Sequence, residues 1–477
     1  MLGGGRATVA RVTASKPRMA TVVIPQNQDE KPLSSYDELL SVFHQACKPA
    51  SSFRCGAEIE KFGVLSDGSP IGYQGESGVR ALMNELAQTK GWAEQVESDG
   101  GPVIALVRDG ASITLEPGSQ FELSGSPFEN CHQVCAELSE HMGELAPFSE
   151  RHGIRWLGVG FHPFAQREPF VMVPKQRYAI MREYLPRRGT LALDMMLRTA
   201  TVQANYDYSS EHDAMTKMRV ALRLAPLTTA IFANSPFYEG APFGGKSYRA
   251  KVWLDTDPDR SGLVPGLWKN GATFVDYVEW ALDVPMFMFK RNDQKVTNTG
   301  QTFRSFWKGG FQGHRPTLTD WQMHLNTLFP EVRLKKTIEV RGADSQSGAL
   351  ACALPALYTG IFYDSKALAA ADAFTHDWTF SEVMACREEV WNEGLDVRFR
   401  SGTLVPLAER LIEIAEGGLE RRAILSSAGN DERVHLARLK DLISHGQSPA
   451  DLLIDGIHHA ADMKSEILAR TDVARRR

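Results

Sequence analysis

Carboxylates recur at alternate positions inside three apolar segments of this chain, and that spacing constrains the fold more than any other feature. The segments are residues 55–62, 114–123 and 337–344. Because residues i and i+2 share one face of a β-strand, Glu58 and Glu60 are expected to point together, with Ile59 on the opposite face. The first segment therefore predicts a strand with one acidic face and one apolar face.

The other two segments repeat the pattern. In the second segment, three polar residues have the same parity: Glu116, Gln120 and Glu122. The Pro-Gly pair at 117–118 is expected to bend or bulge the strand between them. In the third segment Glu339 and Arg341 lie two residues apart, so an acid and a base are expected on one face.

A face of several carboxylates is costly unless the groups are solvated, paired or bound to cations. Oxygen donors with few histidines or cysteines suit hard cations such as Mg²⁺, with Mn²⁺ as an alternative, and magnesium indicates a phosphate-bearing substrate. The candidate metal ligands are Glu58, Glu60, Glu116 and Glu122. The candidate arginines for anionic substrate groups are Arg177, Arg198, Arg249 and Arg341. This set predicts magnesium-dependent phosphoryl transfer, but internal ion pairs that hold the sheet explain the same spacing equally well.

Other catalytic signatures are missing from the sequence. It contains no strand-linked Gly-x-Gly-x-x-Gly and no Gly-x-Ser-x-Gly elbow. His162, His458 and His459 are isolated, and we expect them to be structural.

Composition restricts the partners. The chain is 43% hydrophobic and 23% charged, as in a soluble globular protein, and its net charge of −5 argues against nucleic acid as a main partner. No apolar run reaches the ~20 residues needed to cross a bilayer. We expect small-molecule substrates, no nucleic acid, no membrane, and a monomer or weak homodimer.

The cysteines and the N-terminus bear on location. Six cysteines are scattered without paired Cys-x-x-Cys motifs, so we expect buried free thiols and a cytoplasmic protein. The first ~30 residues carry basic side chains and no acid before Asp29, a composition that resembles a transit peptide. We favour the alternative, a disordered tail over residues 1–33.

The order of predicted elements favours an α+β fold with an antiparallel sheet, since strands and helices are interleaved without regular alternation. Strands are predicted near residues 53–63, 111–124 and 197–207, and helices from about 350 to the end. The strand at 197–207 carries four polar residues on one face, namely Thr199, Thr201, Gln203 and Asn205, which indicates either a ligand-lining or a solvated surface. We expect one catalytic domain over residues 34–477, with a helical C-terminal part that carries no site-like cluster.

The segments resemble those of the plant-type glutamate–cysteine ligases, which also occur in many proteobacteria. The family's Gly-x-Glu-x-Glu-Lys-Phe is met by residues 56–62, and its Leu-Glu-Pro-Gly-x-Gln-Phe-Glu-Leu-Ser-Gly by Leu115–Gly125. Further matches lie at residues 177–181, 196–203, 232–237, 253–260, 281–286 and 329–335. The matches are collinear from about residue 34 to the C-terminus.

The resemblance implies a glutamine-synthetase-like fold, in which an antiparallel sheet curves into a funnel flanked by helices. It implies an ATP-dependent reaction in which γ-glutamyl phosphate forms and the cysteine amine displaces phosphate, giving γ-glutamylcysteine on the way to glutathione. It also implies catalytic roles for Glu60 and Arg341, and an Arg249 clamp on the glutamate α-carboxylate. The other implied substrate contacts are Arg177, Tyr178, Arg198 and Gln203. The implied nucleotide contacts are Gln120 and Glu339.

One departure concerns the third segment. After residues 341–344 the family continues with Gly-Pro-Trp and one or two basic residues, whereas this chain continues with Ser345–Leu350. Either the acceptor amine differs or the loop is rewired. A non-catalytic nucleotide- or amino-acid-binding relative is a further alternative. The redox-switch disulfides of the plant enzymes are not expected, because the cysteines do not fall at matching positions, and Cys352 is expected to be a packed thiol.

Overall fold

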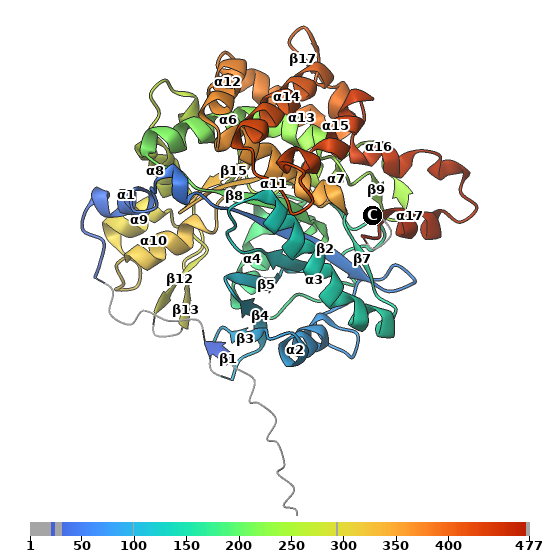
Figure 1. Ribbon diagram of the computed structural model, residues 1–477. Coiled ribbons are helices and arrows are strands. Elements are labelled where there is room, and N and C mark those ends of the chain that lie inside the picture. Colours follow the sequence, from blue (N-terminus) through green and yellow to red (C-terminus); the bar gives the residue numbers. More distant parts are fainter. Residues whose placement is uncertain (1–20, 24–30, 99, 292–293, 474–477) are drawn as a thin grey trace, which may run out of the picture.

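A large, mainly antiparallel sheet organises the molecule. The computed structural model describes residues 21–23, 31–98, 100–291 and 294–473. Among these residues the sheet has ten strands in the order β1-β3-β4-β5-β6-β2-β8-β16-β15, with β7 pairing to β2 (Figure 1). The strands are β1 Thr21–Val23, β2 Cys55–Val64, β3 Ala93–Val96, β4 Val103–Arg108, β5 Ala111–Leu115, β6 Phe121–Ser124, β7 Arg155–Leu157, β8 Thr201–Tyr206, β15 Val332–Leu334 and β16 Ile338–Asp344. All pairs are antiparallel except β1 with β3.

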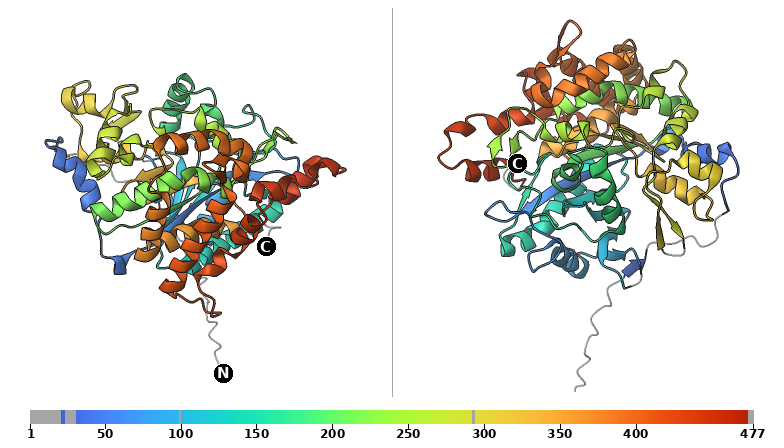
Figure 2. Two further views of the ribbon diagram at one scale, coloured as in Figure 1. Left: turned by 90° about the horizontal axis from the view of Figure 1, so that it is seen from above. Right: turned by 180° about the vertical axis from the view of Figure 1, so that it is seen from behind.

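Helices surround this sheet. They are α1 Tyr36–His44, α2 Val79–Thr89, α3 Cys131–His152, α4 Gln176–Tyr184, α5 Ala192–Arg198, α6 Glu211–Ile231, α7 Tyr248–Leu254, α8 Phe274–Asp283, α9 Phe303–Gly309, α10 Leu318–Leu325, α11 Ala349–Phe362, α12 Ser365–Thr375, α13 Phe380–Glu393, α14 Val405–Arg422, α15 Ala437–Ser444, α16 Pro449–Ile454 and α17 Met463–Thr471. Helices α6 and α11–α14 gather on one side of the sheet (Figures 1 and 2).

Short elements fill the connections. The two-stranded ribbons pair β9 Phe237–Tyr238 with β10 Ala241–Pro242, β11 Ser261–Gly262 with β14 Phe329–Pro330, β12 Met288–Arg291 with β13 Gln294–Thr297, and β17 Arg398–Phe399 with β18 Gly402–Thr403. The 3₁₀ turns are η1 Ala50–Ser52, η2 Leu185–Arg187, η3 Pro265–Trp268, η4 Gly394–Asp396, η5 Glu432–His435 and η6 Ile457–His459.

One face of β2 lies in the hydrophobic core, and the other face carries acidic side chains. Ala57 and Ile59 are buried in the main hydrophobic cluster, together with Val202 and Ala204 of the neighbouring strand β8. Side chains of α6 and α11 belong to the same cluster, so these helices cover the apolar face. The alternate residues of β2 point to the opposite face, and that face carries the acids.

These features confirm an α+β fold with an antiparallel sheet and a helical C-terminal part. The predicted strand over 111–124 is instead two strands, β5 and β6, joined by a turn in which Ser119 has φ of 69°. The predicted strand at 197–207 begins only at Thr201, because the preceding residues form α5. Inside the predicted disordered tail, β1 pairs with β3, whereas residues 1–20 and 24–30 lie outside the described residues.

The cysteines also differ from the expectation of free thiols. Cys135 of α3 and Cys352 of α11 form a disulfide, which corrects the prediction that Cys352 is a packed free thiol. The sequence pattern could not reveal it, because 217 residues separate the two cysteines. Cys55, Cys131 and Cys386 are buried free thiols, as predicted, and Cys47 is half-buried.

No helix within the described residues is both long and apolar enough to span a membrane.

Candidate active site

The sheet register brings the three acidic segments onto neighbouring strands. Strand β2 lies between β6 and β8, and β16 follows β8. Glu60 stands directly opposite Glu122, and Glu58 stands opposite Gln203. On the next strand, Glu339 is opposite Asn205 of β8. Residues far apart in sequence therefore form one continuous polar face.

Hydrogen bonds hold the acids of this face in place. Glu60 Oε2 accepts from the Thr201 main-chain nitrogen at 3.0 Å, and Glu58 Oε1 accepts from Asn205 Nδ2 at 2.8 Å. The two oxygens of Glu122 accept from hydroxyl groups, Thr114 Oγ1 at 2.5 Å and Ser124 Oγ at 2.7 Å.

The same acids repel one another. Burial, and then Glu116 and Glu122, raise the pKa of Glu60 well above its ordinary value. Burial, and then Glu339 and Glu122, raise the pKa of Glu58 to about 7. A bound cation would relieve this repulsion, because it stabilises the ionised carboxylates.

The donor set fits magnesium held jointly with a phosphate. Within the described parts of the chain, no three of these carboxylates bring oxygens within 4.8 Å of one another, so they do not form an all-protein cage. Mg²⁺ usually takes one or two carboxylates and completes its shell with water and substrate phosphates. Glu58, Glu60, Glu116 and Glu122 would therefore hold more than one ion, each through few protein ligands.

Glu339 is the centre of an ion-pair cluster. Arg333 donates to both of its oxygens at 2.8 Å, Lys335 Nζ lies 2.8 Å away, and Arg341 Nη1 lies 2.6 Å away. Burial alone would raise the pKa of Glu339, but the three cations outweigh burial and hold it well below its ordinary value. The structure thus uses Glu339 to orient Arg341, which also donates to Gln203 Oε1, rather than leaving it free for a nucleotide.

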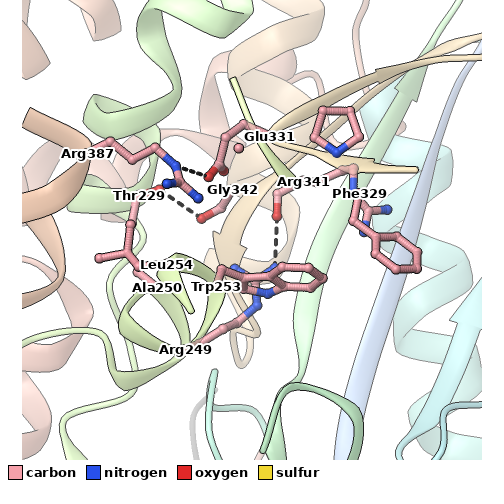
Figure 3. Close-up of a pocket in the computed structure, with 12 residues that line it drawn as sticks. Thr229, Arg249, Ala250, Trp253, Leu254, Phe329, Glu331, Arg341, Gly342 and Arg387 are labelled. Atoms are coloured by element: carbon pink, nitrogen blue, oxygen red, sulfur yellow. Dashed lines mark hydrogen bonds and ion pairs between the residues drawn. The ribbon is translucent and has the colours of Figure 1, made fainter. Parts of the chain in front are cut away.

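A pocket lined by arginines adjoins this cluster. Arg249 of α7 donates to the main-chain oxygen of Arg341 at 3.0 Å (Figure 3). Burial lowers the pKa of Arg249, and the nearby carboxylates of Asp344 and Glu60 oppose this shift. Arg387 of α13 reaches the pocket from the C-terminal helices and donates to Glu331 at 2.6 Å. Arg249 is buried, and its Nε has no hydrogen-bond partner among the described residues, so this donor is available to an anionic ligand.

Two other predicted residues, Tyr178 and Arg177, lie near Glu116. The Tyr178 hydroxyl donates to the Leu115 main-chain oxygen at 2.8 Å and lies 3.4 Å from Glu116 Oε1. Tyr178, and after it Glu116, raise the pKa of the half-buried Arg177. Its Nε also lacks a partner in the described part of the chain. Arg177 therefore lies at the acidic face with an unused donor.

Gln120 and Arg198 are engaged inside the protein. Gln120 Oε1 accepts from Gly118 N at 2.8 Å, and its Nε2 donates to the main-chain oxygens of Met196 and Thr199 at 3.2 and 2.8 Å. This side chain fixes the turn between β5 and β6, which differs from the expected nucleotide contact. Arg198 pairs with Asp194 at 3.1 Å and lies over the ring of Phe161, whereas its Nε and Nη2 have no hydrogen-bond partner among the described residues.

Three residues that line the arginine pocket were not predicted from the sequence. Arg387 comes from helices that were expected to carry no site-like cluster, and Glu331 and Trp253 belong to matching segments without an expected role. The i, i+2 rule cannot find them, because they come from loops and helices that reach the sheet only in the folded chain.

Comparisons with known proteins show one family. The family model "Glutamate-cysteine ligase family 2(GCS2)" matches residues 54–469. The chain is 42% identical over 460 residues to the chloroplastic glutamate–cysteine ligase of Medicago truncatula, covering 96% of this chain and 87% of the relative. It is 42% identical over 448 residues to the chloroplastic glutamate–cysteine ligase of Arabidopsis thaliana, covering 93% and 83%.

A solved structure supports the fold. The glutamate–cysteine ligase from Francisella tularensis, solved in complex with AMP, aligns with a TM-score of 0.54 at 12% identity, covering 88% of this chain and 87% of that one. The plant relatives also correct one expectation. Both are named chloroplastic, so the prediction of a cytoplasmic location is wrong.

Proposed function

Because this chain belongs to glutamate–cysteine ligase family 2, we propose that it joins the γ-carboxylate of glutamate to the amine of cysteine at the expense of ATP. A γ-carboxylate oxygen of glutamate attacks the γ-phosphorus of ATP, and ADP leaves. The cysteine nitrogen then attacks the carbonyl carbon of γ-glutamyl phosphate, and inorganic phosphate leaves as γ-glutamylcysteine forms. The observation that carries this proposal is the register that sets Glu60 opposite Glu122 beside the arginine pocket.

The acidic and the basic residues would have different roles in this reaction. Glu58, Glu60, Glu116 and Glu122 would hold magnesium, which neutralises charge on the transferring phosphoryl group when bound. Arg341, fixed by Glu339 and Gln203, would stabilise the same charge from the protein side. Arg249 would bind the α-carboxylate of glutamate, since it is a buried guanidinium with an unused donor.

The altered segment after β16 favours a rewired loop over a different acceptor. Ser345 Oγ donates to the Glu60 main-chain oxygen at 2.5 Å, and Gln346 Nε2 donates to the Phe232 main-chain oxygen at 2.7 Å. Residues 345–350 are absent from the lining of the arginine pocket, and residues 345–347 are buried. This segment therefore supports β16 from within, which leaves cysteine as the acceptor we propose.

The test is phosphate release by the purified chain with Mg²⁺, ATP, glutamate and a panel of amines, with the product identified by mass. Cysteine is expected to give the fastest release and a γ-glutamylcysteine product. Equal rates with other amines would reject cysteine as the acceptor, and no turnover with any amine would reject the ligase assignment.

A variant pair connects the activity to the acidic face. Glu60→Gln is expected to lower kcat on the order of 10²-fold or more while the circular dichroism spectrum is unchanged. Glu409→Gln is the matched control, because Glu409 is exposed on α14, and it should retain full activity.

A further inference from the structure

A second cluster of ligating side chains lies away from the acidic face. Cys135 of α3, Cys352 of α11 and His435 at the end of η5 place one sulfur or nitrogen atom each within 4.8 Å of one another. Among the described residues this is the only trio of histidine, cysteine or acidic side chains with that geometry. Cys352 is buried, whereas Cys135 and His435 are half-buried, so the trio has a path to solvent.

Hydrogen bonds define which nitrogen of His435 is available. His132 Nε2 lies 3.4 Å from the Ile424 main-chain oxygen, and a carbonyl only accepts, so this nitrogen carries the proton. His132 Nδ1 is then an acceptor, and His435 Nε2 donates to it at 2.9 Å. In the neutral ring this leaves a lone pair on His435 Nδ1, which lies 3.4 Å from Cys135 Sγ.

We propose that the reduced Cys135 and Cys352, together with His435 Nδ1, form a binding site for a thiolate-preferring divalent cation such as Zn²⁺. Two thiolates and one imidazole are a ligand set that selects zinc over magnesium or calcium. His132 acts as a positioning residue, because its bond to the second ring nitrogen fixes the orientation and tautomer of the ligand. A water molecule would complete a tetrahedral site.

Oxidation state decides whether the site exists. In the disulfide form the two sulfurs are bonded to each other and cannot serve as separate thiolate ligands. A dithiol reductant supplies two electrons and two protons, so that the disulfide becomes two thiols and the reductant becomes its own disulfide. Binding of the cation then releases the two thiol protons, whereas the neutral His435 releases none.

The ion would join three segments at one point. The disulfide connects only α3 and α11, which pack side by side (Figure 1), whereas the ion would also include η5. Helix α11 follows β16 after residues 345–348, so the site would brace the helix that supports the strand carrying Arg341.

The test is titration of the full chain with Co²⁺, a spectroscopic substitute for Zn²⁺, in the presence of saturating Mg²⁺ to occupy the carboxylates. After reduction and removal of the reductant, one equivalent of Co²⁺ is expected to give a thiolate-to-cobalt charge-transfer band, and Zn²⁺ should displace it. The oxidised chain should give no band. No band in the reduced chain, or an equal band in the oxidised chain, would overturn the proposal.

Variants separate this trio from other thiols. Cys135→Ser and Cys352→Ser should abolish the band, His132→Ala should weaken Co²⁺ binding about 10- to 100-fold, and His435→Ala should weaken it at least as much. Cys386→Ser is the matched control, since Cys386 is a buried free thiol outside the trio. A band that survives in Cys135→Ser, or that disappears in Cys386→Ser, would assign the ion to other sulfurs and contradict the proposal.

Discussion

Glu58→Gln is expected to stabilise the metal-free protein at pH 8. Burial, and then Glu339 and Glu122, raise the pKa of Glu58 from 4.5 to about 7. The carboxylate therefore costs stability when it is ionised in the folded state. Glutamine removes the charge, and its side-chain oxygen can still accept the hydrogen bond that Asn205 Nδ2 donates at 2.8 Å.

The size of the effect follows from proton linkage. Between pH 4.5 and 7 the folded state binds more protons than the unfolded state, so stability falls as the pH rises through this window. At about 1.36 kcal/mol per pKa unit, the cost above pH 7 is at most roughly 3 kcal/mol. The Glu58→Gln variant should gain about 1–3 kcal/mol at pH 8, and the gain should shrink by up to roughly 2 kcal/mol at pH 5.

Urea unfolding at pH 8 and pH 5, without divalent cations, measures this gain. The same variant should also lose activity, because Glu58 is one of the proposed magnesium ligands. A gain that is equal at both pH values, or a less stable variant at pH 8, would refute the reasoning. Glu409→Gln on the exposed surface of α14 should show no such pH-dependent difference.

Two further variants test buried polar residues, one in β2 and one in the turn before β6. Burial lowers the pKa of Lys61 from 10.5 to about 7, so the unfolded state binds more protons between these values and stability should rise with pH. Lys61→Met should reduce the increase of the unfolding free energy with pH by up to about 1.4 kcal/mol per pH unit, measured by urea unfolding between pH 8 and 10. A slope equal to that of the wild type would contradict the lowered pKa of Lys61. Gln120→Ala removes three buried hydrogen bonds and should lower the unfolding free energy by about 3 kcal/mol. It should also raise KM for ATP, because the turn that carries Glu116 loosens. A variant as stable as the wild type would rule out the role of Gln120 in fixing this turn.

Local spacing predicted the parts of the site that depend on strand geometry. Glu58 and Glu60 share the polar face and Ile59 lies in the core, because alternation follows directly from the pleat of a strand. The pattern could not predict the turn at residues 116–120, where a left-handed residue and the bonds of Gln120 determine the path.

The spacing of residues in the sequence could not predict contacts between distant segments. Glu339 is neutralised by Arg333 and Lys335, and the spacing of Glu339 and Arg341 alone could not distinguish an ion-pair centre from a ligand contact. Arg387 joins the pocket from α13, and Cys135 meets Cys352 from another helix. Each of these pairings depends on how distant elements pack rather than on any local repeat.

The strand order also constrains how this protein acquires its activity. Asn205 bonds Glu58 across 147 residues, and Ser345 bonds the main chain of Glu60 across 285 residues. Contacts between residues so far apart in sequence form late and slowly in folding, because a long loop must be ordered before each contact can form. During synthesis, the acidic face would remain incomplete until β16 has left the ribosome. Fragments that stop before Ile338 therefore lack β16, and they are expected to be inert.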